Sequence, residues 1–252
     1  MSNFDRNYAA PRGYADRAIA IDAGLRAYMI RVYNYMAAGV ALTGVVAWFT
    51  FNAAVVQNAA GGITGLTPFG QAIFGSPLMW VVFLAPVALV FFVSFRINSL
   101  QATTARALFF LYAGLVGLSL ATIFMVYTHT SITRVFFISA ATFGAMSLYG
   151  YTTQRDLSGM GSFLFMGLIG IVIAAMVNIF LASSALQFAI SVVGVLVFTG
   201  LTAFDTQAIK EMYDVNDDGT VAGRKAVMGA LRLYLDFINL FLSLLQLFGD
   251  RR

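Results

Sequence analysis

Seven long apolar runs, each free or nearly free of charge, constrain this chain more than any other feature of its sequence. They lie at roughly 32–53, 78–95, 107–127, 135–153, 160–182, 186–208 and 226–248. About 20 apolar residues suffice for a helix to cross a bilayer. Runs of this length without strand-like alternation favour helices over barrel strands. We therefore expect an all-α polytopic membrane protein with seven transmembrane helices.

The composition supports a membrane protein and excludes other classes. The chain is 60% apolar and 10% charged and has no cysteine, which excludes a soluble globular domain, a disordered chain and a disulfide-stapled module. Its first 31 residues contain no apolar stretch that could be a signal-peptide core. We expect a flexible cytosolic tail at 1–31, a seven-helix transmembrane domain at 32–249 and a short C-terminal end at 250–252.

The basic residues gather on one side of the predicted spans. Eleven fall on the side of the N-terminus: Arg6, Arg12, Arg17, Arg26, Arg31, Arg96, Arg106, Arg155, Lys210, Arg224 and Lys225. Three fall on the other side: Arg134, Arg251 and Arg252. Because cytoplasmic loops carry the excess of Lys and Arg, this asymmetry predicts a cytosolic N-terminus and an external C-terminus. The net charge of +4 then reflects topology, and we expect no nucleic-acid partner.

Two stretches leave the topology partly open. The seventh run contains Arg232 and Asp236, and if it were re-entrant the C-terminal arginines would return to the cytosol, which the charge count tolerates. The link at 54–77 is uncharged and rich in Gly, Asn and Thr. It predicts an external loop partly tucked against the membrane surface, and a mobile loop is favoured over a cap on a pore.

Two aspartates stand inside the apolar runs: Asp205 in GLTAFDTQ and Asp236 in LRLYLDFINLF. A carboxylate at mid-span costs roughly 2.5–3.5 kcal/mol on insertion scales, so an acid accepted there marks a functional site. The two runs are antiparallel, and the aspartates could meet in the cytosolic half of the membrane. Two carboxylates held close share a proton and titrate as a unit. Such a pair would be a pH sensor and a cation site that could take calcium.

Other interpretations of the aspartates remain open. Asp205 could reach the headgroups from the end of its span, and Asp236 could form an ion pair with Arg232, four residues earlier on the same helix face. An intramembrane aspartyl protease is disfavoured because neither aspartate has the glycine-framed setting of such enzymes. A proton-coupled transporter is disfavoured because no matched pair of broken helices is seen. We expect no enzymatic activity.

Further metal-binding patterns are weak. The loop DVNDDGTVAGRK places Asp214, Asn216 and Asp218 at the first, third and fifth positions of an EF-hand, but Lys225 replaces the final glutamate. An acidic turn is therefore favoured over a weak cation site. His129 is the only histidine and there is no cysteine, so we expect no cofactor and no zinc or redox centre.

Three segments together resemble the Bax inhibitor family, also called the transmembrane Bax inhibitor motif family, in its bacterial branch. They are SLYGYTTQRDLSGMGSFLFMGLIGI, GLTAFDTQ and LYLDFINLFLSLLQLFG, and the similarity covers nearly everything after the tail. The resemblance implies six helices wrapped around a central, semi-polar seventh in the bacterial inner membrane. It also implies a pH-sensitive calcium leak across the lipid bilayer, in which Asp205 and Asp236 handle calcium ions and protons.

The resemblance has two further implications. An arginine on the second helix would latch onto the aspartate pair in the closed state, and Arg96 is the candidate by position, with a plain cytosolic anchor as the alternative. No glutamate lies between Pro77 and Phe95, which argues against a conduction mechanism that requires an acid in that helix. Bacterial members that restrain a membrane-bound ATP-dependent protease suggest a second class of function, a regulator that contacts its partner through the cytosolic tail.

Overall fold

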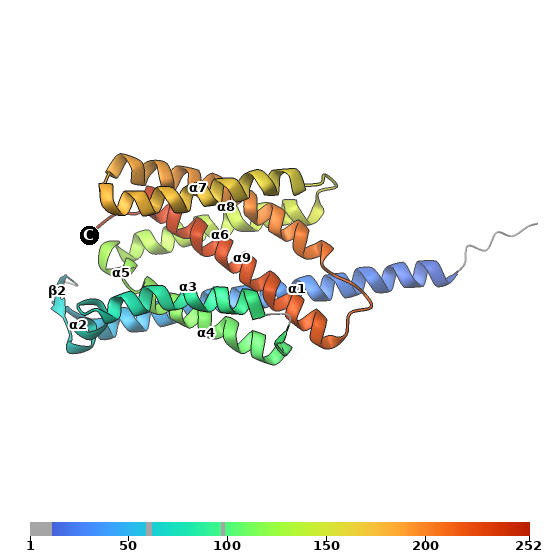
Figure 1. Ribbon diagram of the computed structural model, residues 1–252, viewed down its shortest axis with the longest axis horizontal. Coiled ribbons are helices and arrows are strands. Elements are labelled where there is room, and N and C mark those ends of the chain that lie inside the picture. The colour runs from blue at the N-terminus through green and yellow to red at the C-terminus, as the bar shows by residue number, and fades with distance from the viewer. Residues whose placement is uncertain (1–11, 59–61, 97–98) are drawn as a thin grey trace, which may run out of the picture.

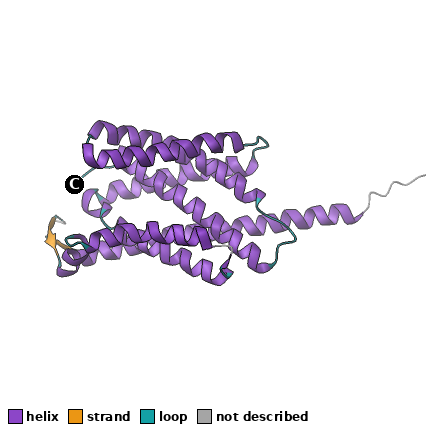
Figure 2. Cartoon of the chain, viewed as in Figure 1, coloured by secondary structure: helices purple, strands orange, loops and turns teal. Residues whose placement is uncertain are grey.

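A computed structural model describes residues 12–58, 62–96 and 99–252, and almost all of the described chain is helical (Figures 1 and 2). The elements in order are α1 (Arg12–Ala54), β1 (Val55–Gln57), β2 (Ile63–Leu66), α2 (Pro68–Phe74), α3 (Leu78–Arg96), α4 (Ala102–Leu120), α5 (Ile123–Val126), α6 (His129–Thr152), α7 (Ser158–Leu181), α8 (Ser184–Glu211) and α9 (Gly219–Phe248). The prediction of an all-α polytopic membrane protein is confirmed.

Seven segments of the described chain are long and apolar enough to cross a membrane. They are Ala23–Ala54 within α1, Ala102–Val126 across α4 and α5, and the whole of α3, α6, α7, α8 and α9. Each predicted run falls inside one of these segments or overshoots its end by a single residue. The apolar runs therefore located the spans well, because span length is set by bilayer thickness and is readable locally.

The first helix begins earlier than the predicted end of the tail. α1 starts at Arg12 and runs unbroken to Ala54, so the boundary at residue 32 marks a change in hydropathy and not the start of a helix. Alanine and arginine, common in this stretch, favour helix even where the sequence is charged. Residues 1–11 of the predicted tail lie outside the described residues, and the cytosolic location of the tail stays a prediction.

The link at 54–77 has more structure than the mobile loop that the sequence favoured. β1 pairs with β2 as an antiparallel hairpin, and Thr67 caps α2 by accepting a hydrogen bond from the Gly70 amide at 3.1 Å. A methyl group at Gly70 would overlap the carbonyl oxygen of Ala54, so the absent side chain lets α2 lie against the end of α1. This close approach holds the hairpin at the end of the bundle (Figure 2).

α9 lies at the centre of the bundle. It packs against α1, α4, α6 and α8, while α3 packs mainly against α4 and α7 mainly against α8. Of the residues in the most apolar stretch of each span, 72% are buried in α9 but only 6% in α7. The central seventh helix is therefore confirmed, with the qualification that α3 and α7 form an outer layer (Figure 1).

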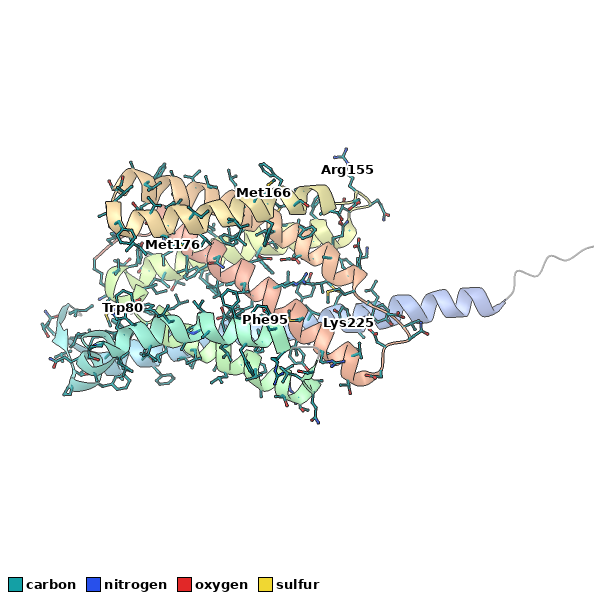
Figure 3. All side chains as sticks on the ribbon, viewed as in Figure 1. Trp80, Phe95, Arg155, Met166, Met176 and Lys225 are labelled. Carbon is teal, nitrogen blue, oxygen red and sulfur yellow. The ribbon has the colours of Figure 1, made fainter. Side chains whose placement is uncertain are left out.

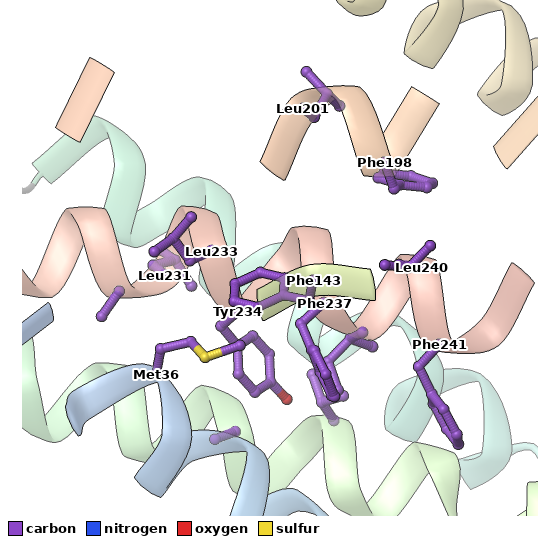
Figure 4. Packing of buried hydrophobic residues seen from close by; sticks show 14 of the residues in the cluster. Met36, Phe143, Phe198, Leu201, Leu231, Leu233, Tyr234, Phe237, Leu240 and Phe241 are labelled. Carbon is purple, nitrogen blue, oxygen red and sulfur yellow. The ribbon is translucent and has the colours of Figure 1, made fainter. Parts of the chain in front are cut away.

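The centre of the bundle is held by a buried tyrosine on α9. Tyr234 packs edge-on against Phe109 and Tyr112 of α4, with ring centroids 5.8 and 5.7 Å away. Figure 4 shows Tyr234 among the buried side chains of the core. The Tyr234 hydroxyl donates to Thr43 Oγ1 at 2.6 Å, and Thr43 donates to the Ala113 carbonyl at 2.8 Å. These bonds tie α1, α4 and α9 together without leaving the hydroxyls unpaired in an apolar interior.

The links between the spans lie at alternating ends of the molecule, as seven crossings require. The start of α1 and the α6–α7 and α8–α9 links lie at one end, and the C-terminus and the hairpin lie at the other (Figure 1). Arg155 and Lys225 lie at the first end, and apolar side chains such as Trp80 and Met166 project outward between the ends (Figure 3). α9 is one helix of 30 residues, so it crosses as a single span, and the re-entrant alternative does not hold.

Candidate ion-binding site

The structure brings the two predicted aspartates together. Asp205 lies near the C-terminal end of α8 and Asp236 lies midway along α9, and these antiparallel helices pack along their length. The carboxyl groups of Asp205 and Asp236 lie close enough to interact, and they line the same cavity. Two carboxylates held this close favour a shared proton, because both cannot be charged cheaply in an apolar setting. Titration of the pair as a unit stays a prediction.

The pair is removed from water. Asp236 is 4% exposed, and its Oδ2 has no hydrogen-bond partner among the described residues. The Asp205 side chain is 15% exposed. A buried carboxylate oxygen without a partner carries a desolvation penalty of about 1–3 kcal/mol, and more when charged. Asp236 is therefore held in a setting that favours a proton or a cation at this oxygen.

Arg232 pairs across the helix interface and not along its own helix. Its Nη1 lies 3.7 Å from Asp205 Oδ1, whereas the spacing of four residues had suggested a pair with Asp236. The reason is the direction of the two side chains: Asp236 points into the bundle, while the Arg232 side chain is 43% exposed and reaches the acid nearer the edge. The structure thus shows an ion pair of Arg232 with Asp205, and an ion pair of Arg232 with Asp236 stays a prediction.

A cavity of about 390 Å³ opens beside the aspartates. Its polar lining comes from Asp205, Arg232, Asp236 and Asn239, and the remaining lining residues are Gly161, Phe165, Leu168, Phe198, Leu201, Phe204 and Leu235. Apolar walls lower the local dielectric and strengthen the interaction of the carboxylates with any cation that enters. The cavity can therefore admit a small cation to the pair.

The described residues hold no cluster of three or more acidic, histidine or cysteine side chains that could bind a metal ion. Calcium prefers six to eight oxygen ligands, and the pair supplies two carboxyl groups, with the amide of Asn239 beside them in the cavity. Calcium at Asp205 and Asp236 stays a prediction, and the chemistry suits an ion in transit better than one held permanently.

Arg96 lies away from the pair. It is the last residue of α3, it is exposed, and α3 packs mainly against α4. Among the residues that the structure describes, no ion pair to Arg96 is present, and the arginine beside the aspartates is Arg232. The role of Arg96 as a latch therefore stays a prediction, for a state other than this one.

The acidic loop after α8 uses its carboxylates within the protein. Asp218 caps α9 by accepting from the amides of Thr220 and Val221 at 2.8 and 2.7 Å. Asp217 pairs with Lys225 at 2.6 Å. The hydrogen bond from the Asn216 amide holds the pKa of Asp214 below its ordinary value. These roles support the acidic turn over the EF-hand-like cation site.

The sequence analysis missed a polar stripe along α9. Arg232, Asp236, Asn239, Ser243 and Gln246 follow spacings of four and three, so they share one helix face. Near the C-terminal end of α9, Gln246 Oε1 accepts hydrogen bonds from Gln187 Nε2 at 2.6 Å and from Ser191 Oγ at 2.7 Å, both on α8. The signal was available as helical periodicity of uncharged polar residues, but only the charged residues had been considered.

The fold and the site define a class: polytopic α-helical membrane proteins with a pair of acids brought together between their last two spans. Residues 25–252 match the family described as Inhibitor of apoptosis-promoting Bax1. The chain belongs to this family.

Several bacterial relatives are similar over nearly their whole length. An uncharacterized protein of Rickettsia prowazekii is 50% identical, over 92% of this chain and 92% of its own. The inner membrane protein YbhL of Escherichia coli K12 is 47% identical, over 94% of this chain and 97% of its own. An uncharacterized protein of Caulobacter vibrioides is 42% identical over the full length of both chains.

Proposed function

We propose that this protein is a pH-sensitive leak channel for calcium, gated by protonation of Asp205 and Asp236. The observation that carries the proposal is the meeting of two carboxyl groups from neighbouring spans beside one cavity, with a buried oxygen of Asp236 that has no partner among the described residues. In ion pairs that serve only stability, the buried polar atoms normally all have partners. This site leaves a strong acceptor available to a proton or a cation.

Gating follows from the shared proton. With one proton present, the hydrogen bond holds α8 and α9 together at the level of the pair. When that proton leaves, two like charges face each other in a low-dielectric setting and the hydrogen bond is lost, so separation of the helices is favoured. Arg232 compensates only Asp205 directly, and the charge on Asp236 then drives the opening.

The location and orientation belong to the same proposal. YbhL, a relative of nearly equal length, is an inner membrane protein, and the seven apolar segments suit a multi-pass protein of the bacterial inner membrane. The excess of basic residues on the side of the N-terminus supports a cytoplasmic N-terminus. Asp205 and Asp236 then lie in the cytosolic half of the membrane, with lipid bilayer around the bundle and calcium and protons as the species handled.

The test is calcium flux into liposomes that contain the purified protein and a trapped calcium dye, measured over a range of pH. We expect flux to rise with pH in the wild type. Asp205→Asn and Asp236→Asn should each abolish most of that pH dependence, and the double variant should add little, because either change removes the like-charge repulsion. Asp217→Asn, which removes an acid in the α8–α9 loop, is the matched control and should behave as wild type.

The outcome against the proposal is a normal pH profile in well-folded Asp236→Asn. Independent sites would instead give roughly additive effects on a free-energy scale in the double-mutant cycle. The alternative function, regulation of a membrane-bound ATP-dependent protease through the N-terminal tail, stays a prediction. Deletion of residues 2–25 separates the two, because a channel should keep its flux without them.

A further inference from the structure

A groove runs along the bundle between α1 and α6. Three cavities, of about 430, 270 and 330 Å³, follow one another along these helices. The first two share Phe143, and the second and third share Val40, Phe136 and Phe237. The three cavities therefore adjoin one another along these helices, and Phe237 of α9 lines the second and the third.

Nothing in the described chain fills this groove. A methyl group at Gly144 of α6 or at Gly44 of α1, both of which line it, would meet no atom within 4 Å. Ile30 and Leu148, at the first cavity, are 49% and 65% exposed. The two helices are joined near this cavity by the hydroxyls of Tyr33 and Ser147, 2.6 Å apart. Space remains beside this contact for an elongated apolar molecule.

The groove has a charged side chain at one end only, while Thr43 and Thr133 line its far cavity. The cavity nearest the start of α1 is lined by Arg26, Tyr33, Ser147 and Tyr151 together with apolar side chains. Arg26 forms no ion pair with any residue whose side chain is described. Lys210 lies 5.2 Å from the centre of the Tyr151 ring and adds positive charge at this end. The next cavity is lined wholly by apolar side chains.

The length of this polar-to-apolar stretch matches one leaflet. From Arg26 to Ala41, which line the first and second cavities, 15 residues of helix span about 22 Å at 1.5 Å per residue. One half of a bilayer, headgroups included, is about 20–22 Å thick. Arg26 lies near the start of the apolar segment Ala23–Ala54 and precedes the uncharged run by six residues, so it falls at the headgroup end of this span.

We propose that the groove between α1 and α6 binds a phospholipid with an acidic headgroup, from the leaflet at the N-terminal end of α1. Arg26 contacts the phosphate, the hydroxyl-lined wall of the first cavity receives the headgroup, and the acyl chains lie along the apolar part beside Gly144 and Ala37. Charge complementarity favours an anionic headgroup, and a charged end followed by a wholly apolar stretch fits a lipid of one leaflet.

The test uses the full-length protein, delipidated in detergent, with phosphatidylglycerol and phosphatidylcholine of identical acyl chains, and native mass spectrometry as the readout. Both lipids present a phosphate to Arg26, but choline adds a positive charge that Arg26 and Lys210 repel. The wild type should therefore retain phosphatidylglycerol better than phosphatidylcholine, by about tenfold for a difference of about 1.4 kcal/mol. Arg26→Gln should lower retention of both lipids and reduce that preference. Arg31→Gln, an exposed arginine of the same helix outside the groove, should keep it. Gly144→Leu, which fills the groove, should lower retention of both lipids.

Four outcomes would overturn the proposal. Equal retention of both lipids by the wild type would remove the headgroup assignment, and equal losses in Arg26→Gln and Arg31→Gln would remove the site. Displacement of phosphatidylglycerol by glycerol phosphate would indicate a free-phosphate site. A dimer in the wild-type spectrum that Gly144→Leu abolishes would make a second copy of the chain the occupant. All variants change exposed or unfilled positions, so each can be compared in the folded state.

Discussion

The Arg232 guanidinium on α9 lies 3.7 Å from the carboxylate of Asp205 on α8, although Asp236 stands one turn away on the same helix as Arg232. The two aspartates therefore have different surroundings within the bundle. Asp205 has a cation within ion-pair distance at the edge of the cavity, whereas Asp236 is more deeply buried and its Oδ2 has no hydrogen-bond partner among the described residues. The difference between them leads to the first prediction.

Removal of Arg232 should change the pH dependence of calcium flux. In Arg232→Gln the positive charge that favours ionised Asp205 is lost, so the pair keeps its proton to higher pH. The pH of half-maximal flux should rise, by up to about one unit, which corresponds to about 1.4 kcal/mol. Arg232→Lys keeps the charge and should stay close to wild type. An unchanged midpoint in Arg232→Gln would show that this contact has no part in gating.

Arg96 provides the comparison on α3. As a latch it would hold the closed state, and Arg96→Ala should then raise calcium leak at low pH, with little rescue by lysine because an ammonium lacks the two-pronged geometry. Because Arg232 and not Arg96 contacts the pair here, we expect Arg96→Ala to shift the midpoint less than Arg232→Gln. Flux equal to wild type at every pH would leave Arg96 as a topological anchor.

A methyl group at Gly150 should destabilise the contact between α6 and α8. It would overlap the carbonyl oxygen of Ala203, and backbone atoms in packed helices move little. We expect Gly150→Ala to cost about 1–3 kcal/mol, measured by thermal unfolding in detergent. Gly114→Ala on α4 is the control, because a methyl group there meets no atom within 4 Å. Equal stability of the two variants would contradict the close packing of α6 on α8.

Loss of the Asp218 side chain should weaken the start of α9. Its two hydrogen bonds to amides of the first turn make it an N-cap, and replacing such a cap by alanine costs about 1 kcal/mol. Thermal unfolding should show this loss for Asp218→Ala and a smaller one for Asp214→Ala, which caps no helix. Calcium should stabilise neither protein through this loop. A calcium-dependent stabilisation that Asp214→Ala removes would instead support a cation site there.

The side of the membrane that each loop faces can be determined by labelling single cysteines with a membrane-impermeant reagent, because the chain has no cysteine of its own. Single cysteines at Asn7 and Asp217 should react from the cytosolic side, and a cysteine at Gln57, in β1, should react from the outside. The expectation rests on the excess of basic residues on the side of the N-terminus. Labelling of the Gln57 cysteine from the cytosolic side alone would reverse the topology.

The site was only partly predictable. Asp205 and Asp236 stood out because acids are costly in apolar runs, and their meeting followed from two antiparallel neighbours. The partner of Arg232 did not follow, because a spacing of four shows that two residues share a helix face but not which neighbouring helix supplies a closer charge. Gln187, Ser191 and Gln246 were missed because uncharged polar residues carry a smaller penalty and a weaker signal.

The seven spans and the two functional acids could be identified from the sequence, because hydropathy and insertion cost act on each segment separately. The helices that surround α9, the outer position of α3 and α7 and the groove between α1 and α6 became known only from the three-dimensional structure. These depend on how helix faces fit one another, and lipid-facing and helix-facing sides of an apolar span have nearly the same composition. Packing between helices, which no single segment encodes, settled them.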